Sequence, residues 1–203
     1  AEGNCFFFPY INEDEVFRAP DWAQGGIIYQ LLVDRFCNGS TDNDPPGCKD
    51  VAELPDRNTY YGGDFQGVME KLDYLSSLGV SILYLSPVFL SPTYHKYDTI
   101  DYYSVESAYG GEEKLKELID AAHDRGLAVI LDGVFNHSSD RHPFFLDLKE
   151  KGKDSKYADW YCVTDFADGG SPIYESFGGL VPEMPRWNTS NAEVAGYLTE
   201  VAC

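Results

Sequence analysis

Three segments of the chain repeat one order of apolar strand, polar loop and amphipathic helix. Nearly continuous apolar runs predict strands over residues 25–36, 80–89 and 127–135. Apolar residues at helical spacing predict helices over residues 64–79, 111–126 and 190–203. Asp64 is the predicted N-cap of the first helix, Gly79 and Gly126 are predicted to end the first two, and Ser190 or Asn191 caps the third.

The lengths of the connections favour one architecture. The segments between a helix and the next strand are short, whereas those between a strand and the next helix are long and polar. Continuous apolar strands that alternate with helices predict a parallel sheet covered by helices. Long loops after the strands are typical of an α/β barrel, where they carry the functional site. A doubly wound sheet is the competitor, but the chain lacks its glycine-rich turn after the first strand.

The expected fold class is α/β, as the N-terminal part of a (β/α)8 TIM barrel with about three and a half βα units. Residues 25–137 form the first three units. Residues 138–188 mix aromatic residues, Gly and Pro without steady periodicity, which predicts an irregular subdomain inserted after strand three. Residues 189–203 begin the third barrel helix. Both sheet edges of such a part would be unpaired, so we expect a homo-oligomer or pairing with the rest of a barrel.

Composition narrows the choice of partners. A formal charge of −19 argues against nucleic acid or an anionic membrane as a partner, since both require a basic surface. The sequence contains no apolar run long enough to cross a membrane. Its five cysteines are far apart and form no CxxC pair, so a zinc site is not expected. Free thiols in a reducing compartment are the simpler interpretation, and we expect a cytoplasmic protein.

Four motifs, in order along the chain, carry a resemblance to a known family. "DGVFNH" (132–137) at the end of the third strand resembles the first signature region of the α-amylase superfamily of glycoside hydrolases. Residues 91–110 are similar to that family's loop after strand two, and "MPRWN" (184–188) to its fifth region. Residues 6–39 resemble the entry into strand one in the neopullulanase, cyclomaltodextrinase and maltogenic amylase branch. The resemblance implies that residues 1–24 link a carbohydrate-binding domain to the barrel.

The resemblance also implies roles for particular residues. His95, Tyr97 and His137 would bind the sugar at the cleavage subsite, with Tyr97 stacked on the ring. Supporting roles fall to three others: Asp98, Asp132 and Asn136. The alternative without a functional role is that Asp132, Asn136 and His137 only cap a strand end. The tyrosines of the loop would then be half-buried loop residues, as we expect for Tyr102 and Tyr103.

No residue of this chain is predicted to be catalytic. The family's nucleophile, a strand-four Asp, and its acid/base, a strand-five Glu, are expected beyond Cys203. The expected function is therefore part of a retaining hydrolase acting on α-1,4 and possibly α-1,6 glucans: starch, maltodextrin, cyclodextrin or pullulan. The 203-residue chain alone is expected to be inactive. A non-enzymatic carbohydrate- or partner-binding barrel is the alternative.

A calcium ion is the expected cofactor. The branch has a calcium loop after strand one, and the matching positions are Asn38, Ser40, Asn43, Asp44, Gly62 and Asp64. Ser40 replaces an Asp, which removes one negative ligand and should weaken the affinity, because calcium prefers charged oxygens. An Asx-rich turn without a metal is the competing interpretation.

Overall fold

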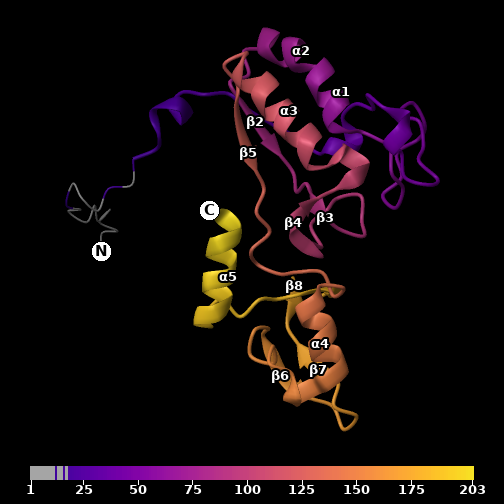
Figure 1. Cartoon of the computed structure of the whole chain (residues 1–203), viewed down its shortest axis with the longest axis vertical. Helices are drawn as coiled ribbons and strands as arrows, with labels where there is room; N and C mark the ends of the chain where they lie inside the picture. Colours follow the sequence, from indigo (N-terminus) through magenta and orange to yellow (C-terminus); the bar gives the residue numbers. More distant parts are fainter. Residues whose placement is uncertain (1–11, 13–15, 17) are drawn as a thin grey trace, which may run out of the picture.

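The computed structural model describes residues 12, 16 and 18–203. Most of the N-terminal part of the predicted linker, residues 1–11, 13–15 and 17, lies outside them. The centre of the fold is a three-stranded parallel sheet of order β1-β2-β5 (Figure 1). Its strands are β1 (Ile28–Leu31), β2 (Ile82–Leu85) and β5 (Ala128–Leu131). The prediction of a parallel sheet is confirmed, with in-register pairing of all four residues in each strand.

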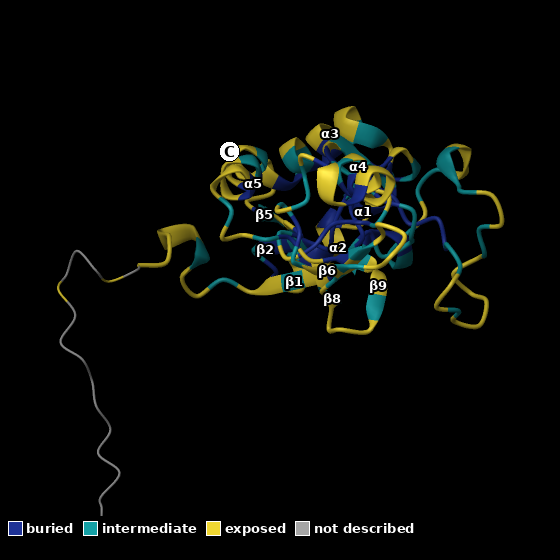
Figure 2. Cartoon of the chain, turned by 90° about the horizontal axis from the view of Figure 1, so that it is seen from below, coloured by how far each residue is buried: buried dark blue, intermediate teal, exposed yellow. Residues whose placement is uncertain are grey.

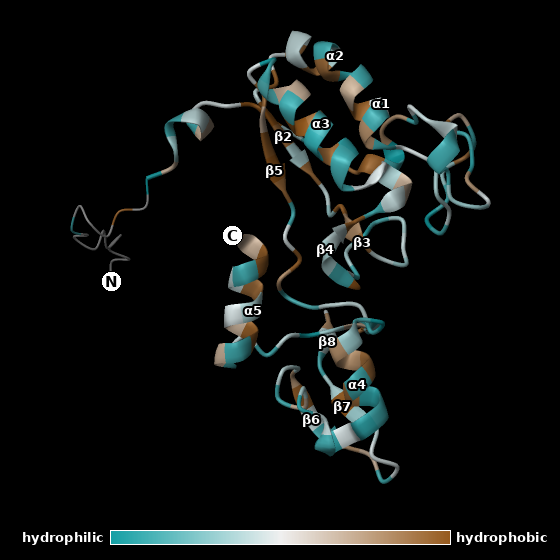
Figure 3. Ribbon diagram, in the orientation of Figure 1, coloured by the Kyte–Doolittle hydropathy of each residue, from teal (hydrophilic) through white to brown (hydrophobic). Residues whose placement is uncertain are grey.

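The helices that follow the first two strands pack on the sheet. They are α1 (Phe65–Glu70), α2 (Leu72–Ser77) and α3 (Gly111–His123). Their apolar faces and the sheet share one buried cluster, in which Val68, Leu75 and Leu118 are fully inaccessible to solvent. Figure 3 shows β2 and β5 as predominantly hydrophobic, and Figure 2 places the buried residues in the middle of the molecule.

Local signals in the sequence correctly marked most helix ends. The Asp64 carboxylate accepts a hydrogen bond from the backbone N–H of Gly67 at 2.6 Å, as an N-cap does. Gly79 and Gly126 have φ values of +81° and +72°, the left-handed conformation that ends a helix. The single helix predicted over 64–79 is instead two, because Lys71 lies between α1 and α2 in a non-helical conformation.

The loop predicted over 91–110 contains a strand. The short β3 (Phe89–Leu90) pairs antiparallel with β4 (Asp101–Val105). Tyr102 on β4 is only 3% exposed and its neighbour Tyr103 is 58% exposed, so the expectation of half-buried loop residues was wrong for both. The Tyr102 hydroxyl is shared between the carbonyls of Val134 and His137, which fastens β4 to the segment after β5.

The predicted insertion is more regular than its sequence indicated. It holds α4 (Pro143–Lys151) and two hairpins, β6 (Val163–Phe166) with β7 (Pro172–Tyr174) and β8 (Ser176–Phe177) with β9 (Val181–Pro185). With α5 (Ala192–Ala202) it forms a second buried cluster around Tyr161 and Trp187, whose rings stack at 4.4 Å. Figure 1 shows this lobe below the sheet, so the chain has two cores joined by the segment after β5.

The sheet has solvent-facing edges. β1 and β5 each pair on one side only within the described residues. Ile28 on β1 is 56% exposed and Leu131 on β5 is 39% exposed, although both are apolar. No helix in the described part of the chain is long and apolar enough to span a bilayer.

Candidate functional site

A pocket opens where β5 ends, on the side of the sheet to which the carboxyl ends of the strands point. Its volume is about 720 Å³. Five of the six residues with predicted binding or supporting roles line it: His95, Tyr97, Asp132, Asn136 and His137. The sixth, Asp98, is 3% exposed and lies behind the loop instead. Parallel strands bring these distant residues together, because the loops after β2 and β5 emerge at the same end of the sheet.

Asp132 is the carboxylate of the pocket. It directly follows β5, and its backbone N–H donates to the Leu85 carbonyl at 3.2 Å. The Tyr97 hydroxyl donates to Asp132 Oδ2 at 3.1 Å. Asp132 is half-buried, which lowers the cost of its charge.

A second phenol faces the same carboxylate. Burial, together with a hydrogen bond to Asp132, raises the pKa of Tyr84 to about 12. Burial and the same carboxylate raise the pKa of Tyr97 above its usual value. Both phenols therefore stay neutral donors at neutral pH. Sequence reasoning missed Tyr84, although its position one residue before the end of β2 places it close to the pocket.

His137 is 4% exposed and has partners on both ring nitrogens. Its Nδ1 accepts from the Asn136 side-chain amide at 3.0 Å, so Nε2 carries the proton and donates to the Tyr97 carbonyl at 3.0 Å. Burial lowers the pKa of His137, which favours this neutral form. A sugar hydroxyl would have to displace the Tyr97 carbonyl to accept from Nε2.

His95 lines the pocket and uses only one of its ring nitrogens within the loop. Its Nδ1 accepts from the backbone N–H of Tyr97 at 3.1 Å, and Thr93 Oγ1 lies 3.1 Å from the same nitrogen. Among the described residues no hydrogen bond uses Nε2. Burial lowers the pKa of His95, so the ring is a neutral Nε2–H donor at neutral pH. Asp98 holds the loop from behind, accepting from the Ser91 hydroxyl at 2.7 Å and from the Thr93 hydroxyl.

The opposite wall of the pocket comes from the inserted lobe. Phe177, Val181 and Met184 line it, and the Phe177 ring lies 5.1 Å from that of His137. Sequence reasoning did not assign these side chains to the site, although Met184 lies within the "MPRWN" motif. The wall exists because the β8–β9 hairpin folds back toward β5, where His137 and Arg186 form a β-bridge.

These side chains suit a polyhydroxylated ring. A pyranose has an apolar face that packs on an aromatic ring and an edge of hydroxyls that needs donors and acceptors. Tyr97 and Phe177 supply aromatic surface, His95 a donor and Asp132 an acceptor. Asp132 is the sole carboxylate among the described residues that line the pocket, whereas glycoside hydrolysis requires a pair.

The six predicted calcium ligands all lie in the connection between β1 and α1. The Asn38 amide donates to Asp44 Oδ1 at 2.8 Å, and a Cβ on Gly62 would come within 2.4 Å of both groups. The Asn43 side chain donates to the Ala108 carbonyl, but its Oδ1 is buried without a hydrogen-bond partner. A buried amide oxygen without a partner fits a ligand of a hard cation.

Two features limit that fit. Both oxygens of the Asp64 carboxylate already accept from backbone N–H groups, those of Gly39, Ser40 and Gly67. Within the described residues there is no group of three or more His, Cys, Asp or Glu side chains that could hold a metal. A cation here would therefore depend mainly on neutral oxygens, as the Ser40 replacement suggests.

The comparisons with known proteins agree on one family. A family model described as the alpha amylase catalytic domain matches residues 30–202. Neopullulanase 2 of Thermoactinomyces vulgaris is 43% identical over 206 residues, covering 100% of this chain and 35% of that protein. Cyclomaltodextrinase of Thermoanaerobacter pseudethanolicus is also 43% identical, over 97% of this chain and 35% of its own length. The chain thus spans about a third of the curated relatives it matches.

The fold comparison agrees. The ligand-free structure of a cyclic alpha-maltosyl-(1→6)-maltose hydrolase from Arthrobacter globiformis superimposes with a TM-score of 0.83 at 34% identity. That match covers 91% of this chain and 42% of the hydrolase chain.

Proposed function

The chain belongs to the α-amylase catalytic-domain family, and on that premise we propose that it supplies the substrate-binding half of a retaining α-glucan hydrolase. The observation that carries the proposal is the pocket at the carboxyl end of β5, where Tyr97, His95 and Asp132 converge from two loops. The substrate would be an α-1,4-linked glucan, or a mixed α-1,4 and α-1,6 one such as pullulan. The matched relatives bear the names neopullulanase and cyclomaltodextrinase, which supports this class.

Each pocket residue has a proposed role. The Tyr97 ring stacks on the apolar face of a glucose unit while its hydroxyl stays on Asp132. His95 donates its Nε2–H to a sugar hydroxyl, since its Nδ1 is already used within the loop. His137 and Asn136 hold the Tyr97 backbone in place from the other side.

The bond-breaking residues lie elsewhere in our proposal. A retaining mechanism needs a nucleophile and a general acid about 5–5.5 Å apart, and one pocket carboxylate cannot serve both roles. Asp132 would instead accept a hydrogen bond from a sugar hydroxyl or form an ion pair with a cationic side chain on a neighbouring strand. We propose that the nucleophile and the acid/base follow Cys203 in a longer protein, with residues 138–188 as an inserted domain.

We further propose that Asn38, Asn43 and Asp44 hold a calcium ion, with Gly62 contributing backbone close to them. The ion would be structural. It would tie the loop after β1 to η5 (Ser107–Tyr109), since Asn43 already bonds to Ala108. It would take no part in the chemistry at the pocket.

The proposal is tested on the endogenous protein. Mass spectrometry should give an intact mass larger than that of this chain and a C-terminus beyond Cys203. The purified protein should hydrolyse maltotetraose, cyclodextrin or pullulan. Tyr97→Ala should abolish most of that activity, whereas Tyr103→Ala, a change at an exposed tyrosine, should not. A protein that ends at Cys203 and binds α-glucans without turnover would overturn the hydrolase proposal in favour of a binding protein.

A further inference from the structure

Lys96 has an unusual backbone conformation between two pocket residues. It is the one non-glycine residue with a positive φ, +61°, in the part of the chain that the structure describes. A residue with a side chain adopts this left-handed conformation at a cost, and it persists only where the surroundings hold it. The Lys96 side chain is 1% exposed, so it points away from solvent into the fold.

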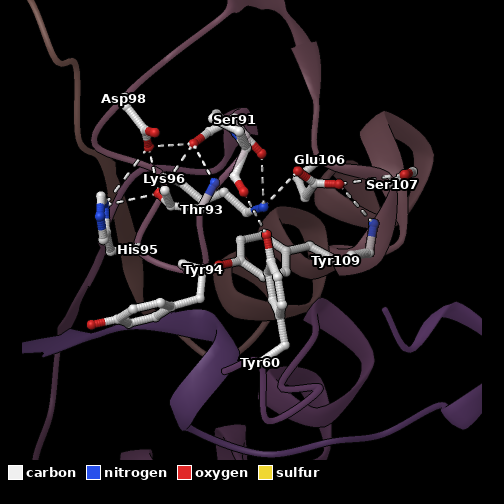
Figure 4. Close-up of polar contacts among 12 residues, drawn as sticks. Tyr60, Ser91, Thr93, Tyr94, His95, Lys96, Asp98, Glu106, Ser107 and Tyr109 are labelled. Atoms are coloured by element: carbon white, nitrogen blue, oxygen red, sulfur yellow. Dashed lines mark hydrogen bonds and ion pairs between the residues drawn. The ribbon is translucent and has the colours of Figure 1, made fainter. Parts of the chain in front are cut away.

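A buried ion pair anchors that side chain (Figure 4). Lys96 Nζ donates to Glu106 Oε2 at 2.7 Å and to the Ser91 carbonyl at 3.3 Å. The same ammonium lies 5.1 Å from the ring centroid of Tyr60 and 5.5 Å from that of Tyr109. The ammonium is therefore compensated by the Glu106 carboxylate, by a carbonyl and by two aromatic faces, as a buried lysine requires.

The acidic partner is itself held by several hydrogen bonds to backbone groups. Glu106 is 7% exposed, and its Oε1 accepts from the backbone N–H of Ala108 at 3.2 Å, which caps η5. Its own N–H donates to the Val88 carbonyl at 2.9 Å, and its carbonyl accepts from Gly111. The ion pair thus ties the pocket loop to the junction between β4 and α3.

The turn at Lys96 sets where its two neighbours point. With Lys96 directed inward, His95 and Tyr97 both line the pocket. Their positions are linked, because the Tyr97 N–H bonds to His95 Nδ1 and the Tyr97 carbonyl accepts from His137. A change in the backbone at 96 would move the aromatic ring and the imidazole donor together.

We propose that Lys96 is a positioning residue of the pocket: its ion pair with Glu106 holds the left-handed turn that aims His95 and Tyr97 at the sugar. The inference rests on the proposed α-glucan binding for its functional readout. Asp98 also fastens the loop, through Ser91 and Thr93, so a purely stabilising role for Lys96 is the competing account.

The test compares three Lys96 variants with one control in the full-length protein. Lys96→Met removes the charge and keeps the strain, Lys96→Gly removes the charge and relieves the strain, and Lys96→Arg keeps the charge. The control is Leu118→Ala, which leaves a cavity in the core cluster of α3, away from the pocket. Three quantities are measured: the melting temperature, the Kd for maltotetraose at 25 °C, and the NMR signal of His95 in protein labelled with [13C]histidine. His95→Gln assigns that signal.

Lys96→Met and Lys96→Gly should each move the His95 signal and weaken maltotetraose binding by about tenfold or more, because positioning is lost even where the strain is gone. Lys96→Arg should stay within about threefold of the wild type. Leu118→Ala should lower the melting temperature without moving the signal or the Kd.

The proposal is overturned if Lys96→Met lowers the melting temperature as Leu118→Ala does and leaves both the His95 signal and the Kd unchanged. Should Lys96→Met fail to fold, Glu106→Gln decides by the same criteria, since it removes the charge but keeps an acceptor for Ala108. A wild-type protein that binds no α-glucan refutes the proposed function, while the His95 signal still decides the role of Lys96.

Discussion

Lowering the pH should loosen the inserted lobe through one buried histidine. His142 is 2% exposed and caps α4, accepting from the backbone N–H of Phe144 at 3.3 Å through Nδ1. Its ring packs edge-to-face on Trp187 at 5.2 Å, and Nε2 lies 3.4 Å from the Tyr197 hydroxyl. A protonated ring could no longer accept at Nδ1, so the charge would break the cap as well as enter an apolar cluster.

The magnitude follows from the pKa difference. Burial lowers the pKa of His142 from 6.5 to about 4, with Asp101 opposing the shift. Between these values the unfolded chain binds the proton and the folded one does not, so stability falls as the pH is lowered through this window. The stability that neutral His142 contributes is fully present above about pH 6.5. At about 1.36 kcal/mol per pH unit, stability at pH 4.5 is lower than at pH 7.5 by about 2.5 kcal/mol.

Hydrogen exchange of α5 is the assay, because this helix packs on His142 through Tyr197. The opening free energy of its amides, corrected for intrinsic exchange rates, is compared at pH 7.5 and 4.5 for the wild type and His142→Asn. Asn can still cap the helix but cannot take up a proton. The opening free energy of the wild type minus that of His142→Asn should be smaller by about 2.5 kcal/mol at pH 4.5 than at pH 7.5.

His123→Asn, at an exposed position on α3, is the control and should not change the pH dependence. If the opening free energies of the wild type and His142→Asn differ by the same amount at both pH values, the reasoning is refuted. Such a result would mean either that the folded protein accommodates the charge or that the unfolded chain does not gain the proton.

Four further outcomes are expected. Tyr97→Phe, which loses the hydroxyl that donates to the pocket carboxylate, should weaken maltotetraose binding by about tenfold in calorimetry, and an unchanged Kd would contradict that role. Ser40→Asp should increase the rise in melting temperature that calcium produces over EGTA, whereas Ser77→Asp on α2 should not; equal shifts would exclude the proposed metal loop. Trp187→Ala should cost about 3–5 kcal/mol in urea unfolding, against almost nothing for the exposed Trp22→Ala. The 203-residue chain alone should show no glycosidase turnover and should self-associate in sedimentation through its unpaired edges, and an active or monomeric chain would contradict this.

The sequence by itself determined the elements whose signals are local. Apolar runs placed the three strands of the central sheet, and helical spacing placed the segments of α1–α2, α3 and α5, although not the break between α1 and α2. The cap at Asp64 and the left-handed glycines at 79 and 126 followed from residue chemistry. The resemblance of their motifs to a known family singled out His95, Tyr97 and Asp132, and the structure brings all three into one pocket.

Only the tertiary structure decided the rest, because the rest depends on contacts between distant segments. β4 pairs with β3, and its Tyr102 hydroxyl hydrogen-bonds to the segment after β5. No local pattern in the sequence encodes these contacts. Phe177 and Met184 reach the pocket because a hairpin of the inserted lobe folds back on β5. The left-handed turn at Lys96 is unfavourable for its residue type, so local propensity argues against it, and a buried partner ten residues away maintains it.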